Sequence, residues 1–261
     1  MCFKKAVAKS SGFSRIFAFG LMIFSGAGLI NLCTVCAETT DELQGPPVAQ
    51  SHIIGIDPGH QGPNVDMSDL EPLGPGSTEM KAKASTGTQG TFSGLPEYQL
   101  NLDVALKLRD ELEARGYEVY MIRETNDVDI SNAERAQLAA ESGSDILVRI
   151  HANGSDNTSV AGALTMAPSM ANPYLSQEMI AECQKLSQCI ITAFCASTGA
   201  NNQGVYQTDE MSGLNWCSIP ATIVEMGYMT NQEEDTRMQT ADYQQQMVTG
   251  IADGIDQYFA S

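Results

Sequence analysis

Apolar runs and amphipathic segments alternate along this chain from residue 52 to its C-terminal end. A short apolar run between turn residues is typical of a buried strand, and apolar residues at spacings of three and four are typical of a helix. The runs predict strands at His52–Asp57, Glu118–Arg123, Asp145–His151, Gly162–Ala167 and Thr222–Met226. The helical pattern covers Tyr98–Arg115, Ser131–Glu141, Pro173–Ser197 and Ala241–Tyr258. This alternation predicts a single α/β domain with a mostly parallel, mixed β-sheet of about six strands, covered by helices on both faces.

Two of the predicted helices carry clear boundary signals. Apolar residues recur at every fourth position from Leu100 to Leu112, and Gly116 follows at the expected end of that helix. Ser131 and Glu134 have the spacing of a capping box at the start of the next helix.

The segment Gln61–Pro96 interrupts the alternation. It is rich in Gly, Ser, Thr and Pro and has no clear strand or helix pattern, so we expect a long loop insertion within the domain. An unstructured segment of this length is usually functional. It could line a groove, cover the groove as a lid, or only pack on the surface.

The first 37 residues have the pattern of a signal peptide for export. Lys4, Lys5, Lys9 and Arg15 precede or begin a long apolar run, and the segment 35–37 (Val-Cys-Ala) suits a peptidase cleavage site. We therefore expect residues 1–37 to be removed, residues 38–51 to form a flexible leader, and residues 52–261 to form the folded domain. A retained membrane anchor is the alternative, because the apolar run is long.

Acidic residues dominate the charge. The chain has 14 Lys+Arg against 32 Asp+Glu, a net charge of −18, and loss of the four N-terminal cations would leave 10 against 32, or −22. This balance argues against nucleic acid or an anionic membrane as a partner. We expect a monomer that is not stably inserted in a membrane once the signal peptide is cleaved.

Four cysteines remain after residue 37. Cys183, Cys189 and Cys195 recur at six-residue intervals on a predicted helix, where each step rises about 9 Å and rotates roughly 240°, so they cannot bridge one another. Pairing of Cys217 with one of them stays open, and small buried thiols are the simpler interpretation.

Two of the three histidines lie where apolar runs end. His60 follows the first predicted strand, and His151 ends the third. In open α/β sheets the functional sites form at the carboxyl ends of the strands, whereas His52 begins its strand and lies at the wrong end. Two imidazoles, together with Glu97 and Glu225 from other segments, indicate a hydrolytic metal centre. Zinc is the expected ion, because catalytic zinc takes three protein ligands of these types and leaves one position for water.

The acidic residues each have a second interpretation. Glu97 follows Pro96 at the start of a helix, where it could be the third ligand or could only interact with the helix dipole. Glu225 lies in an apolar strand, where burial would raise its pKa and suit a general base. It could instead pair with a buried arginine, for which the candidates are Arg123, Arg135 and Arg149. Asp57 is a candidate to orient a metal ligand or the turn, and no serine elbow or phosphate-binding loop competes with the metal centre.

Four short motifs occur together in a family order, from about residue 53 to residue 259. The motifs are Ile56–His60, Glu97–Leu102, Ile150–Asn153 and Val224–Asn231. As a set they resemble the zinc-dependent N-acetylmuramoyl-L-alanine amidases of the amidase-3 family. The chain differs from many members at Arg149, where serine is frequent, and in the longer segment between the first histidine and the glutamate.

The resemblance implies that His60, Glu97 and His151 bind one zinc ion, that Glu225 is the catalytic glutamate, and that Asn153 contributes to substrate binding. It also implies the reaction, in which zinc-activated water hydrolyses the amide between N-acetylmuramic acid and L-alanine in peptidoglycan. The expected protein is a secreted cell-wall amidase, an autolysin, located at the wall or in the periplasm of a Gram-negative host. Two alternatives stay open: a non-catalytic wall binder with the same fold, and a zinc carboxypeptidase that cuts within the stem peptide.

Overall fold

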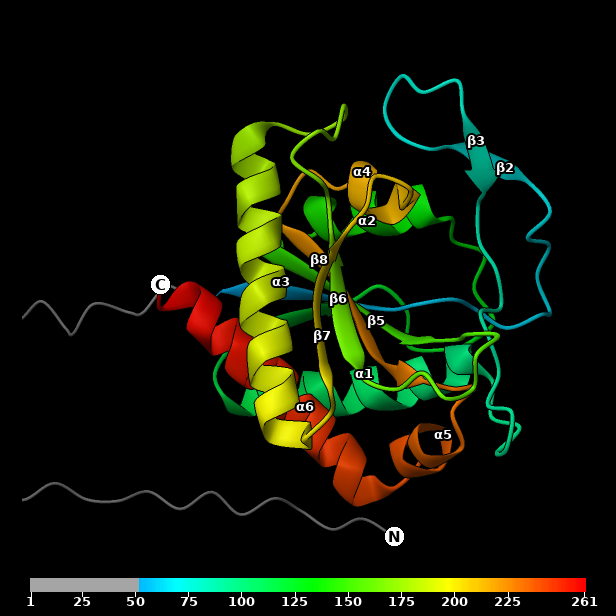
Figure 1. Cartoon of the computed structure of the whole chain (residues 1–261). Helices are drawn as coiled ribbons and strands as arrows, with labels where there is room; N and C mark the ends of the chain where they lie inside the picture. The colour runs from blue at the N-terminus through cyan, green and yellow to red at the C-terminus, as the bar shows by residue number, and fades with distance from the viewer. Residues whose placement is uncertain (1–51) are drawn as a thin grey trace, which may run out of the picture. The chain divides into compact units, whose positions relative to one another are not determined.

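A six-stranded mixed sheet forms the centre of the computed structural model, which describes residues 52–261 (Figure 1). The predicted signal peptide and leader lie outside the described residues. The strands of the sheet are β1 (Ile53–Pro58), β4 (Glu118–Met121), β5 (Ile146–Asn153), β6 (Ala163–Ala167), β7 (Asn202–Gln207) and β8 (Ala221–Tyr228). Their order is β4-β1-β5-β8-β6-β7, and every pair is parallel except β6 and β8. The predicted mixed, mostly parallel sheet is confirmed.

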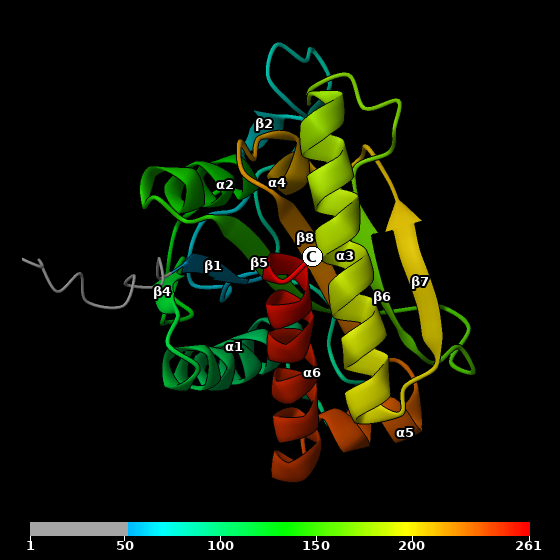
Figure 2. The same ribbon diagram turned by 90° about the vertical axis from the view of Figure 1, so that its left-hand side faces the viewer.

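Helices cover both faces of the sheet. They are α1 (Glu97–Ala114), α2 (Asn132–Glu141), α3 (Gln177–Thr198), α4 (Ser212–Asn215), α5 (Gln232–Met238) and α6 (Ala241–Phe259). Alternate residues of the central strand β5 point to opposite sides: Val148 packs in the large core with α1, α3 and α6, whereas Leu147 packs with α2 and α4. Figure 2 shows α1 and α2 on opposite sides of β1. Within the described part of the chain, no helix is both long and apolar enough to cross a membrane.

Side-chain caps set where the helices begin. Ser131 and Glu134 form the predicted capping box at α2. The third predicted helix begins at Gln177 rather than Pro173, because Ser176 caps it by accepting a hydrogen bond from the Met179 amide. The polar edge strand β7 and the short helices α4 and α5 were not predicted, since they lack a long apolar period.

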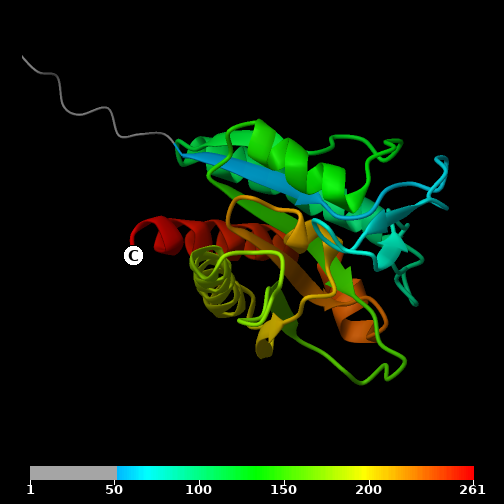
Figure 3. The same cartoon turned by 90° about the horizontal axis from the view of Figure 1, so that it is seen from above.

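The segment Gln61–Pro96 contains a small antiparallel hairpin, so the prediction of a loop without strands was wrong. Its strands are β2 (Leu70–Pro72) and β3 (Met80–Ala82), with Glu71 opposite Lys81. The hairpin lies on the side of the domain away from the C-terminus (Figures 1 and 3). Three residues are too few for a periodic pattern to appear in the sequence.

All four cysteines of the described residues are free thiols. Cys183 and Cys217 are buried, and Cys189 and Cys195 are half-buried. Burial raises the pKa of the Cys217 thiol to about 12. The interpretation of these residues as small packing thiols holds for the buried pair, and no disulfide forms among residues 52–261.

Candidate metal centre

The register of the parallel strands brings the predicted site residues to one face of the sheet. His151 on β5 is directly opposite Glu225 on β8, and Asp57 on β1 is opposite Arg149 on β5. Register partners on neighbouring strands point to the same face. Both strands continue by two residues past their predicted ends, so His151 lies inside its strand rather than at its last residue, and Glu225 lies three residues before the end of β8.

His60 stands in a turn directly after β1 and has a left-handed backbone conformation, with φ of 63°. A non-glycine residue in this region costs of order 1–3 kcal/mol, which the surrounding contacts must offset. Gly59 comes before it, and a Cβ at that position would lie 2.2 Å from the His151 imidazole. Glycine is therefore required where the turn passes over the second histidine.

Three donor atoms converge at the carboxyl edge of the sheet. The Glu97 Oε1 atom lies 3.2 Å from His60 Nε2 and 3.3 Å from His151 Nδ1. All donor atoms of this group lie within 4.8 Å of one another. Tetrahedral zinc with bonds of about 2.0–2.1 Å has ligand atoms separated by about 3.3–3.4 Å. The nitrogen and oxygen donors suit one zinc ion, and the separations of Glu97 Oε1 from the two imidazole nitrogens fit its tetrahedral geometry.

Backbone and side-chain donors fix the Glu97 carboxylate from both sides. Oε1 accepts hydrogen bonds from the Ala152 amide at 3.1 Å and from Asn101 Nδ2 at 3.2 Å, and Oε2 accepts one from the Thr88 amide at 2.8 Å. Burial works to raise the pKa of Glu97, but hydrogen bonds with His151 and His60 outweigh it and hold the pKa far below its usual range. The carboxylate is therefore ionised, as a metal ligand must be.

The two histidines are held differently. His60 Nδ1 contacts the Ser85 hydroxyl at 2.9 Å and the Ser85 carbonyl at 3.2 Å, which leaves Nε2 directed at the centre. A partner on the far nitrogen is the usual way in which a metal-binding histidine is oriented. Burial lowers the pKa of His151 to about 4, so its imidazole is neutral at pH 7 and has a lone pair to offer.

Glu225 lies beside this group, and its buried Oε2 atom has no hydrogen-bond partner within residues 52–261. Burial, and then the negative charge of Glu97, raise the pKa of Glu225 to about 8. The alternative that Glu225 pairs with a buried arginine is wrong, since Arg123, Arg135 and Arg149 all bond to other groups. A buried carboxyl oxygen left without a partner is costly and is therefore typical of a functional position.

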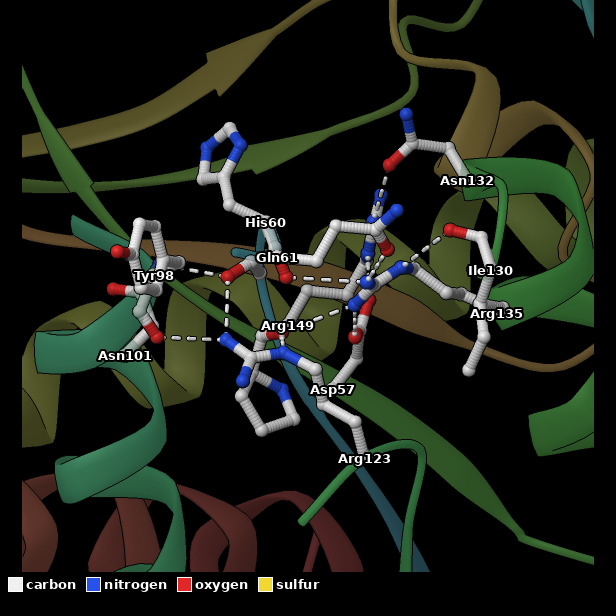
Figure 4. A network of polar contacts seen from close by, with 12 residues as sticks. Asp57, His60, Gln61, Tyr98, Asn101, Arg123, Ile130, Asn132, Arg135 and Arg149 are labelled. Atoms are coloured by element: carbon white, nitrogen blue, oxygen red, sulfur yellow. Dashed lines mark hydrogen bonds and ion pairs between the residues drawn. The ribbon is translucent and has the colours of Figure 1, made fainter. Parts of the chain in front are cut away.

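Two buried arginines hold the turn that carries His60 (Figure 4). Arg123 donates to the carbonyls of Pro58 at 2.7 Å and Gly59 at 3.0 Å, and Arg135 donates to those of Pro58 at 3.0 Å and His60 at 3.1 Å. The His60 imidazole points away from these guanidinium groups (Figure 4). The network therefore fixes the backbone of the turn and leaves the ring directed at the centre.

Asp57 belongs to this network rather than to the ligands. Its carboxylate accepts from Arg135 Nη1 at 2.6 Å and Arg149 Nε at 2.8 Å, and it has no hydrogen bond to His60 or His151 among the described residues. Asp57 does not hydrogen-bond to a metal ligand, so the prediction that it orients one directly is wrong. Asp57 instead supports the turn through Arg135, which is the other role that the sequence predicts for it.

Several supporting residues were not found by sequence reasoning. Asn101 could have been, because it lies four residues after Glu97 on the same helix face. Ser85 and Thr88 come from the segment Gln61–Pro96, where no local signal marks them. Asn153, the predicted substrate-binding residue, is half-buried and accepts a hydrogen bond from the Gly154 amide.

These features define the class of protein: a single α/β domain with a candidate mononuclear metal centre at the carboxyl edge of a mixed sheet. The model of the N-acetylmuramoyl-L-alanine amidase family, amidase-3, matches residues 54–257. The match covers most of the chain, and the protein belongs to this family.

Individual relatives agree with this membership. The chain is 26% identical over 229 residues to N-acetylmuramoyl-L-alanine amidase LytC of Bacillus subtilis. This match covers 88% of this chain but only 39% of LytC. The crystal structure of the amidase Ami1 from Mycobacterium smegmatis superposes with a TM-score of 0.72 at 25% identity, covering 80% of this chain and 97% of Ami1. An N-acetylmuramoyl-L-alanine amidase from Clostridium difficile 630 gives a TM-score of 0.66 at 25% identity, covering 81% and 98% of the two chains. The resemblance drawn from the four motifs is confirmed.

Proposed function

We propose that this protein is a zinc-dependent N-acetylmuramoyl-L-alanine amidase that hydrolyses the amide between N-acetylmuramic acid and L-alanine in peptidoglycan. The observation that carries the proposal is the convergence of His60 Nε2, His151 Nδ1 and Glu97 Oε1. Beside them lies Glu225, whose Oε2 atom has no hydrogen-bond partner in the described part of the chain. Family membership supports the substrate.

In this proposal the three donors hold one zinc ion, which supplies Lewis acidity to a water molecule and to the amide carbonyl. The arginine-supported turn and the Ser85 contact keep the His60 ring in the ligand orientation. Glu225 Oε2 accepts a proton from the attacking water and returns it to the leaving nitrogen of L-alanine. The buried surroundings of Glu225 keep bulk water from competing for that proton.

The test uses purified sacculi, with and without a chelator, and identifies the new amino terminus. We expect free L-alanine amino groups, released only in the presence of metal. Glu225→Gln should lower kcat by about 10²–10⁴-fold while the zinc content is unchanged. Glu118→Gln, at an exposed position of β4, is the matched control and should keep full activity. Cleavage elsewhere in the peptide would support the carboxypeptidase alternative, and binding without cleavage would support the wall binder.

We also propose that Asn153 contacts the substrate. Its Oδ1 accepts from the Gly154 amide at 2.8 Å, and its Nδ2 has no hydrogen-bond partner among residues 52–261, so that amide can donate to a substrate carbonyl. Asn153→Ala should raise KM more than it lowers kcat. An unchanged KM would remove Asn153 from the binding site.

Export is a further part of the proposal. The cationic start, apolar run and cleavage motif of residues 1–37 support a signal peptide, removal of which would deliver a monomeric autolysin to the wall or periplasm. The mass of the exported protein tests whether residues 1–37 are removed. Its sedimentation tests whether the protein is a monomer. A full-length chain retained in the membrane fraction would instead favour the anchor.

A further inference from the structure

A hollow of about 270 Å³ opens beside the candidate metal centre, and His60 and His151 form part of its wall. The remaining wall comes from five elements of the domain that are distant in sequence. The residues are Lys81, Ala82, Asn132, Arg149, Glu210, Met211, Ser212, Gly213 and Ile223. A substrate whose scissile amide lies at the centre would extend one of its halves into this hollow.

The hollow is less acidic than the rest of the domain. Four of the 14 cations and three of the 32 acidic residues precede residue 52, which leaves 10 cations against 29 acidic residues in the domain. The hollow nevertheless has two cations, Lys81 and Arg149, and one acidic residue, Glu210. An anionic ligand repelled elsewhere would be favoured here.

Lys81 is the accessible cation of the two. The Arg149 side chain is 3% exposed and already bonds to Asp57 and Asn132. The Lys81 side chain is 37% exposed, and its Nζ atom lies 3.0 Å from an Oε atom of Glu210, which is 63% exposed. Such an exposed pair is weak, so an incoming carboxylate can take the place of Glu210.

The hairpin that carries Lys81 is anchored by other contacts. Buried Glu71 accepts hydrogen bonds from the Ala133 amide and the Ser212 hydroxyl, and Trp216 Nε1 donates to the Pro72 carbonyl at 2.8 Å. The hairpin is therefore a fixed wall, and loss of the Lys81–Glu210 pair would leave it in place.

We propose that this hollow binds the peptide side of the substrate and that Lys81 binds a carboxylate of the stem peptide. The inference rests on the proposed function. The muramic acid side of the scissile amide has no charge, because its lactyl carboxyl group is the one in amide linkage, whereas stem peptides have free carboxylates. Lys81 thus determines specificity for acidic stem peptides, and Glu210 competes with the substrate for the Lys81 ammonium group.

The test compares two soluble muramyl peptides that differ only in whether the carboxyl group of the second stem residue is free or amidated. The wild-type protein should prefer the free carboxylate. Lys81→Met should raise KM for that substrate about fivefold to tenfold, with kcat and the amidated substrate unaffected. Glu210→Gln should act in the opposite direction and lower KM for the free carboxylate about twofold to threefold.

Lys83→Met is the matched control, because Lys83 pairs with Asp69 and Asp129 around a different hollow and should leave both substrates unchanged. If the Lys81–Glu210 pair only supported the hairpin, both variants would raise KM for both substrates, which overturns the inference. A wild-type protein that cleaves both peptides equally well also overturns it and leaves the proposed function standing. Cleavage of neither peptide refutes the proposed function itself.

Discussion

Replacing Asp57 with asparagine removes a charge that two buried arginines share. The Asp57 side chain is fully buried, and the side chains of Arg135 and Arg149 are 1% and 3% exposed. After the change, Arg135 keeps its bonds to Pro58, His60 and Gln61, but two guanidinium groups lose their buried counter-ion. Removing one partner of a buried ion pair costs about 3–5 kcal/mol. We expect the free energy of unfolding at pH 7 to fall by that amount.

The pH dependence tests the same reasoning. Burial works to raise the pKa of Asp57, but the charges of Arg135 and Arg149 outweigh it and hold the pKa well below the ordinary value of 3.8. A carboxyl group with a lowered folded-state pKa stabilises the fold above its unfolded-state pKa, and this stability is lost as the pH falls toward the folded value. The difference in the free energy of unfolding between the wild type and Asp57→Asn should be constant from pH 5 to 7. At pH 3 this difference should be smaller by about 1 kcal/mol.

Urea unfolding of the metal-free proteins measures both quantities. The chain has a single tryptophan, Trp216, whose half-buried ring bonds to the hairpin and serves as the fluorescence probe. Asp110→Asn is the matched control, because the Asp110 side chain is 67% exposed and its pair with Arg109 should contribute under about 0.5 kcal/mol. A loss below about 1 kcal/mol for Asp57→Asn, or a difference that does not change between pH 6 and 3, would refute the role assigned to the network.

Three further outcomes concern the centre and its surroundings. Ser85→Ala removes the hydroxyl contact of His60 Nδ1 and keeps the contact with the Ser85 carbonyl, so zinc binding should weaken by about 10-fold, as measured by chelator competition. An unchanged affinity would remove the Ser85 hydroxyl from the support of the ligand. Gly59→Ala should prevent metal binding, because the alanine Cβ would overlap the His151 ring. The zinc content of the variant, measured by atomic absorption, checks this prediction, and full zinc occupancy would contradict it. Cys217, with its pKa raised to about 12, should resist iodoacetamide at pH 8 until the protein is unfolded, and rapid labelling of the native protein would show that the thiol is accessible.

Local patterns predicted the parts of the site that lie on regular elements. His60 and His151 follow or end apolar runs, and the alternation of side chains along a strand then fixes which face His151 occupies. The position of Glu97 at the first residue of α1 could be expected from Pro96 and the helical period after it. Glu225 was recognised because an acidic residue is unusual in an apolar strand.

The contacts that support the site had no local signal. Ser85 lies 25 positions after His60, beyond the hairpin, and contacts it all the same. Arg135 contacts Asp57 from a helix 78 positions away. Sequence spacing cannot tell which of several arginines a buried carboxylate will meet. The alternative that Glu225 pairs with Arg123, Arg135 or Arg149 could therefore be excluded only from the contacts that these arginines make in the folded domain.

The sequence by itself determined the α/β architecture, the edge of the sheet that carries the chemistry, and the four residues of the candidate centre. The architecture and the edge depend on burial periodicity and strand direction, which are properties of short segments, whereas the roles of the four residues rest on the resemblance carried by the motifs. Only the tertiary structure decided that His60 adopts a left-handed turn held by Arg123 and Arg135. It also decided that, among residues 52–261, nothing bonds to Glu225 Oε2, and that the hairpin places Lys81 in the same hollow as the two histidines. Each of these depends on contacts between segments that are distant in the chain, and their geometry is set by packing rather than by any local pattern.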